Sequence, residues 1–190
     1  MTTQTTTSTP DTWLARYYSV RAAFSIAWVA AAFALASSTP VIVSALLLIY
    51  PAWDAAANLV DAHRSGGLTR NPTQLVNAVV SVGVTAAVAV ANSPHAVLTT
   101  FGVWAIFSGL LQLATGARRR RGNGGQWPMI LSGAQSTLAG AMFVAKASAP
   151  HVVTITTVAQ YAAFGAFYFL VAALWLARSI RLSSRAPRSS

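Results

Sequence analysis

The residues most able to do chemistry lie in one short stretch of an apolar chain. Asp54, Asn58 and Asp61 include two of the three acidic residues and are spaced at i, i+4 and i+7, so a helix would carry them on one face. A carboxylate inside a membrane costs roughly 2.5–3.5 kcal/mol on insertion scales. These carboxylates therefore need either a partner that holds helices together or a function such as binding a proton or a ligand.

Arg21 is the basic residue best placed to pair with one of these carboxylates. Counted inward at about 1.5 Å per residue, its depth falls between those of Asp54 and Asp61. We hypothesise an ion pair between Arg21 and one of the two aspartates, as a structural clamp or as part of a working site. The full predicted polar cluster, placed in one half of the membrane by depth, comprises Arg21, Asp54, Asn58, Asp61, Gln135 and Tyr168.

The composition indicates a membrane protein. Hydrophobic residues make up 55% of the 190-residue chain and charged residues only 8%, against about 25% charged in an average globular domain. The chain has no cysteine, which excludes disulfides, thiol catalysis and cysteine-bound metals. The net charge of +10 does not point to nucleic acid, because the basic residues lie between apolar runs and form no amphipathic stripe.

Six apolar segments are each long enough to cross a hydrocarbon core of roughly 30 Å as a helix. We therefore predict an all-α integral membrane bundle of six transmembrane helices over residues 17–178. A disordered tail (1–16) precedes it and a basic tail (179–190) follows. The predicted spans are residues 17–37, 41–62, 75–91, 97–117, 128–147 and 153–178.

The basic residues predict the orientation in the plasma membrane. Of the 13 lysines and arginines, every one except Lys146 falls on the side of the two termini. The positive-inside rule then places both termini in the cytoplasm.

Weak internal similarity divides the spans into three helical hairpins, at about residues 17–64, 73–121 and 126–180. The second helix of each has two aromatic residues three apart, at 50 and 53, 101 and 104, and 164 and 167. Serines 25, 81 and 136 occupy matching places in the first helices. In this register Ala105 and Tyr168 correspond to Asp54, so only the first hairpin carries a carboxylate there.

No arrangement of residues indicates an enzyme, a cofactor or a metal site. Ser136 has no histidine in a helix core to act as its base. Ser132, Ser136 and Gly140 form a row of small residues that favours helix packing, within one chain or in a homo-oligomer. A basic run determines topology and is also suited to anionic lipid head groups at the cytoplasmic face; it consists of Arg118, Arg119, Arg120 and Arg121.

Four motifs resemble the HdeD-like bacterial membrane proteins, a family of short repeats with six helices in hairpins. They are RAAFSI from residue 21, YPAWD from residue 50, FGVWAIFSGLLQL from residue 101 and QWPMILSG from residue 126. The chain differs in having alanine, not glycine, after Arg21 and Asp54. The resemblance implies a bacterial inner-membrane protein with a role in stress or acid tolerance and supplies no catalytic residue. We therefore predict a structural or stress-protective multi-pass membrane protein, because the half of the membrane opposite the polar cluster offers almost no polar groups for a through-route. A small-solute or proton transporter or channel that uses Asp54 and Arg21 is the alternative function.

Overall fold

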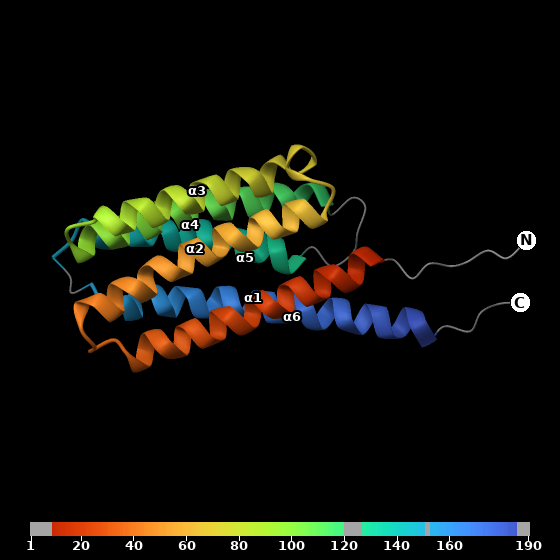
Figure 1. Cartoon of the computed structure of the whole chain (residues 1–190), viewed down its shortest axis with the longest axis horizontal. Helices are drawn as coiled ribbons and strands as arrows, with labels where there is room; N and C mark the ends of the chain where they lie inside the picture. The colour runs from red at the N-terminus through yellow and green to blue at the C-terminus, as the bar shows by residue number, and fades with distance from the viewer. Residues whose placement is uncertain (1–8, 120–126, 151–152, 186–190) are drawn as a thin grey trace, which may run out of the picture.

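A computed structural model describes residues 9–119, 127–150 and 153–185, and all of its long elements are helices (Figure 1). The elements are, in chain order, α1 (Thr9–Ala34), α2 (Pro40–Arg64), the short 3-10 helix η1 (Leu68–Arg70), α3 (Pro72–Val90), α4 (Pro94–Arg119), α5 (Trp127–Ala147) and α6 (Ile155–Arg185). The chain is therefore all-α, as predicted.

Proline and glycine mark the helix boundaries. Helices α2, α3 and α4 each begin with proline, which suits the first helical position because it has no backbone N–H to leave unpaired. The α2–α3 connection turns through Gly66 and Gly67, both with positive φ (103° and 95°), a conformation that glycine adopts without strain. The Asn71 amide holds this turn together through three backbone carbonyls.

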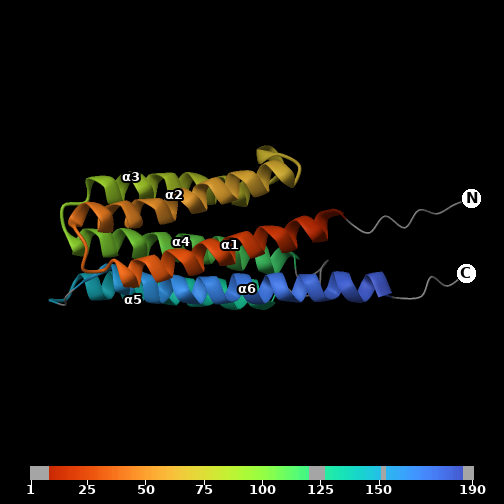
Figure 2. The same cartoon turned by 60° about the horizontal axis from the view of Figure 1, so that its bottom comes forward.

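The six long helices form a closed ring in which each packs against its neighbours in sequence and α1 packs against α6. Figures 1 and 2 show the helices aligned along one long axis, with α1 beside α6 and α3 beside α4. Consecutive helices are antiparallel, which is consistent with the predicted hairpins. The most extensive contacts, however, join α4 to α5, α1 to α6 and α2 to α3.

Glycines let α4 and α5 approach closely. Gly102 faces Gly140, and Gly109 faces Gly133, so that a Cβ on Gly109 would lie only 2.6 Å from the Gly133 carbonyl oxygen. The small-residue row predicted on α5 thus contributes one member, Gly140, to packing within the chain.

The apolar core occupies one half of the bundle. We call the end where α1 begins and α6 ends the basic end, because it carries the arginines of the α2–α3 turn and of the end of α6. The core lies in the opposite half, and its buried side chains include Trp28, Leu98, Phe101, Phe143 and Val158. This half is densely apolar, as the sequence pattern predicts.

Two helices extend further than the sequence predicts. Helix α1 begins at Thr9, so residues 9–16 of the predicted disordered tail are helical. Pro10 is the second residue of this helix, and proline is tolerated in a first turn. The aromatic ring of Trp13 stacks on Tyr17. Helix α6 continues to Arg185, so residues 179–185 of the predicted basic tail are helical as well.

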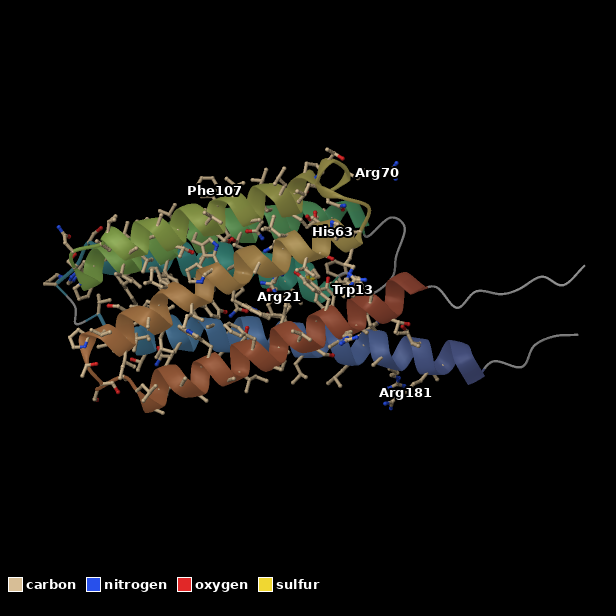
Figure 3. All side chains as sticks on the ribbon, in the orientation of Figure 1. Trp13, Arg21, His63, Arg70, Phe107 and Arg181 are labelled. Carbon is tan, nitrogen blue, oxygen red and sulfur yellow. The ribbon has the colours of Figure 1, made fainter. Side chains whose placement is uncertain are left out.

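Four of the described helices are long and apolar enough to cross a membrane: α2, α3, α4 and α6. The protein is therefore a multi-span membrane protein. Large apolar side chains cover its outer surface, and Figure 3 shows Phe107 projecting outward from the bundle. Such a surface suits lipid and does not suit water.

Candidate functional site

Asp54, Asn58 and Asp61 share one face of α2, and this face points into the bundle. All three residues are buried, with whole-residue exposures of 7%, 6% and 6%. The i, i+4, i+7 spacing therefore places the three residues on one face of α2, as predicted. They form a column of polar groups in the half of the bundle near the basic end.

Arg21 of α1 forms an ion pair with Asp54 through its Nη2 atom and the Asp54 Oδ1 atom. Asp54 is one of the two partners proposed from the sequence. The other terminal nitrogen of Arg21 donates a hydrogen bond to the Tyr17 hydroxyl (2.9 Å), and the guanidinium lies 4.4 Å from the centre of the Phe169 ring. Figure 3 shows Arg21 inside the bundle beside α2. The arginine is thus held by α1, α2 and α6 at once.

The second carboxylate oxygen of Asp54 accepts two more hydrogen bonds. Ser81 Oγ of α3 donates over 2.8 Å, and Asn58 Nδ2 donates over 3.0 Å. Trp104 Nε1 of α4 in turn donates to Ser81 Oγ over 3.0 Å. Asp54 is therefore the centre of a network across four helices, and its buried charge is well compensated.

A branch of this network reaches further along α3 and α4. Asn58 accepts from Asn77 Nδ2 at 3.5 Å, and Asn77 Oδ1 accepts from Ser108 Oγ at 3.0 Å. The buried amides thus extend the polar interior toward the basic end.

Asp61 differs from Asp54 because no cation pairs with it among the described residues. It accepts hydrogen bonds from Gln74 Nε2 and Ser65 Oγ, both at 3.3 Å. Arg64, on the next turn, instead places its guanidinium 5.3 Å from the centre of the Trp13 ring. Asp61 is thus a buried carboxylate with neutral partners only.

These groups line a cavity of about 140 Å³, which we call the central cavity. A cavity needs on the order of 10–15 Å³ of such volume to hold one water molecule, so this space accommodates several waters or one small solute. Side chains from all six long helices form its wall, and the polar ones include Tyr17, Arg21, Ser25, Tyr50, Asp54, Asn58, Asp61, Gln74, Asn77, Ser108, Gln112, Ser132, Ser136 and Tyr161.

The charges of this wall do not balance. Arg21 supplies one positive charge, whereas Asp54 and Asp61 supply two negative charges, which leaves a formal charge of minus one. An unbalanced negative charge in a partly apolar cavity attracts a cation or a proton.

Two members of the predicted cluster lie elsewhere. Gln135 and Tyr168 are part-buried but do not line the central cavity, and Tyr168 packs edge-to-face on Phe167. Of the basic run, Arg118 and Arg119 end α4, whereas Arg120 and Arg121 lie outside the described residues. Ser132 and Ser136, predicted as helix-packing residues, line the cavity, and Ser136 also contacts Tyr161 of α6.

The sequence contained a signal for the partners that were missed. Gln74, Asn77 and Ser81 on α3 are spaced at i, i+3 and i+7. Ser108 and Gln112, one and two turns after Trp104, make a similar stripe on α4. Matching polar stripes on neighbouring helices indicate a shared polar interior.

The fold and the site together define a class: an all-α, multi-span membrane protein whose helices enclose a polar cavity around a buried ion pair. Residues 74–145 match the family model described as a short repeat of unknown function (DUF308). The HdeD-like resemblance predicted from the sequence is thereby confirmed over α3, α4 and most of α5. No curated protein and no solved structure matches the chain.

Proposed function

We propose that this chain is a six-span bacterial plasma-membrane protein that transports a small polar solute or protons through its central cavity. The observation that carries the proposal is the cavity itself. Its wall contains the Arg21–Asp54 pair and also Asp61, which has no cation partner among the described residues. Ionisable residues inside a membrane are costly and commonly serve ion or proton pathways. The proposal assigns no enzymatic reaction and no cofactor.

Four helices meet the criterion of length and hydropathy for a membrane span. The outward-facing side chains of α1 and α5 support these two helices as further spans. Helix α1 exposes Val20, Ile26 and Phe33, and α5 exposes Leu131, Leu138 and Met142. Helices with such outward faces are stable beside lipid. The arginines gathered at the basic end support cytoplasmic termini, so the cavity would face the cytoplasm.

The charge of the wall favours a cationic solute or a proton over an anion. Aromatic side chains around the cavity, including Tyr50, Trp104 and Tyr161, favour the same ligand because their ring faces attract cations. The apolar core of the opposite half closes the route in the described conformation. Transport therefore requires this core to open, as in alternating access.

A structural or stress-protective membrane protein is the second candidate. The observation that favours it is the well-satisfied network of Asp54, which joins α1, α2, α3 and α4 as a clamp would. The family resemblance supports a role in stress or acid tolerance by association only.

Flux measurements on reconstituted protein separate the two candidates. The native protein, Asp54→Asn and Asp61→Asn are placed in liposomes with an internal pH dye, under a proton gradient and with a panel of small cations. We expect flux from the native protein and at least a ten-fold loss in both variants. Ser19→Ala is the control, because Ser19 is exposed and its hydroxyl bonds to its own helix. Absence of flux across the panel in folded native protein would overturn the transport proposal and favour the structural one.

A further inference from the structure

A second hollow lies between α1 and α2 near the basic end, and we call it the α1–α2 groove. It has a volume of about 270 Å³. Its lining comprises Trp13, Arg16, Tyr17, Val20, Arg21, Trp53, Ala56, Ala57, Val60 and Arg64. Val20 and Val60 are about half exposed on the lipid-facing side, at 47% and 49%. Unlike the central cavity, the groove therefore opens toward the membrane.

The groove combines an apolar floor with a basic rim. Alanine and valine side chains of α1 and α2 form the floor, whereas the exposed Arg16 and Arg64 stand at the edge. No acidic side chain lines it. Arg21 also contributes to the wall, but its charge is matched by Asp54.

Two tryptophans that line the groove carry buried indole nitrogens with no acceptor among the described residues. The indole nitrogens of Trp13 and Trp53 are enclosed and make no hydrogen bond there. An indole N–H is a donor only, and buried polar groups nearly always have a partner. A bound ligand with acceptor oxygens would give these two donors hydrogen-bond partners.

We infer that the α1–α2 groove binds an anionic phospholipid from the leaflet at the basic end. Its phosphate would lie between Arg16 and Arg64, its oxygens would accept from Trp13 and Trp53, and an acyl chain would follow Val20 and Val60. Basic residues beside the membrane attract anionic lipid by about five-fold in affinity per residue. An inorganic phosphate would satisfy the arginines but would leave the apolar floor uncovered.

The test is lipid binding by the full-length protein in detergent, measured by native mass spectrometry with phosphatidylglycerol and phosphatidylcholine. Two arginines predict a preference for phosphatidylglycerol of roughly 25-fold. Arg16→Gln and Arg64→Gln should each reduce that preference about five-fold. Arg178→Gln, a change at an exposed residue of α6 outside the groove, should leave it unchanged.

Two further variants locate the site. Replacement of Arg118–Arg121 by glutamine should preserve most of the preference, because the inferred site uses Arg16 and Arg64 for the phosphate. Trp53→Phe should weaken the binding of both lipids, since it removes a hydrogen-bond donor to oxygen atoms that both head groups contain. Equal binding of the two lipids, or Arg16 and Arg64 variants that behave like Arg178→Gln, would overturn the inference. Competition by millimolar inorganic phosphate as effective as that by lipid would also overturn it.

Discussion

The Arg21–Asp54 pair allows a quantitative test by a double-mutant cycle. Both side chains are mostly buried, with exposures of 13% for Arg21 and 10% for Asp54. Removal of one partner from a buried pair costs about 3–5 kcal/mol, because the other charge remains buried without compensation. We therefore expect Asp54→Ala to lower the free energy of unfolding by about 4 kcal/mol, since it also deprives Ser81 and Asn58 of their acceptor.

Arg21→Ala should cost less, about 3 kcal/mol, because Asp54 keeps two neutral donors. If the two charges act on each other, the double variant should lose about 4 kcal/mol and not the sum of about 7 kcal/mol. The difference is a coupling energy of about 3 kcal/mol.

The assay is reversible unfolding in mixed micelles, followed by far-UV circular dichroism. Arg178→Ala serves as the control on an exposed arginine and should lie within about 0.5 kcal/mol of the native protein. Losses that add within about 0.5 kcal/mol would refute the reasoning, because independent sites behave in that way.

Two further predictions concern packing and orientation. Gly109→Ala should destabilise by about 1–3 kcal/mol through overpacking of α4 against α5. Gly83→Ala, where the added methyl meets no atom within 4 Å, should be neutral or stabilising by up to about 1 kcal/mol in the same assay. The chain lacks cysteine, so a single introduced thiol reports its own side of the membrane. An impermeant maleimide should label His95→Cys on intact cells and should leave Leu68→Cys unlabelled until lysis, whereas the reverse result would invert the orientation.

The sequence predicts the height of a residue in the membrane better than the direction in which its side chain points. Depth and the short link between the first two helices predict the Arg21–Asp54 pair, because a regular rise per residue applies to any helix and a short link makes the two helices neighbours. Gln135 and Tyr168 were assigned to the same cluster by depth, yet they do not line the cavity. The rotation of each helix about its own axis decides whether a residue at a given depth faces the cavity. Packing against neighbouring helices sets that rotation.

Contacts between serines and aromatic side chains indicate which positions of the three hairpins correspond to one another. This alignment differs from the one that the aromatic spacing predicts. Tyr161 of α6 donates to Ser136 of α5 over 2.9 Å, and Trp104 of α4 donates to Ser81 of α3. The side chains of Tyr50 of α2 and Ser25 of α1 form the third such interacting pair, and both line the central cavity. The three serines are those matched from the sequence, so the aromatic partners correspond as well.

This register changes which residues correspond to Asp54. Four residues after Tyr50, Trp104 and Tyr161 come Asp54, Ser108 and Gly165, and all three line the central cavity. The positions expected from the aromatic spacing are Ala105, which also lines the cavity, and Tyr168, which does not. Asp54 is still the only carboxylate of the three, but its counterparts now face the same space. The three positions therefore bring a carboxylate, a hydroxyl and a glycine to the same cavity, so the wall is charged on the side of α2 only.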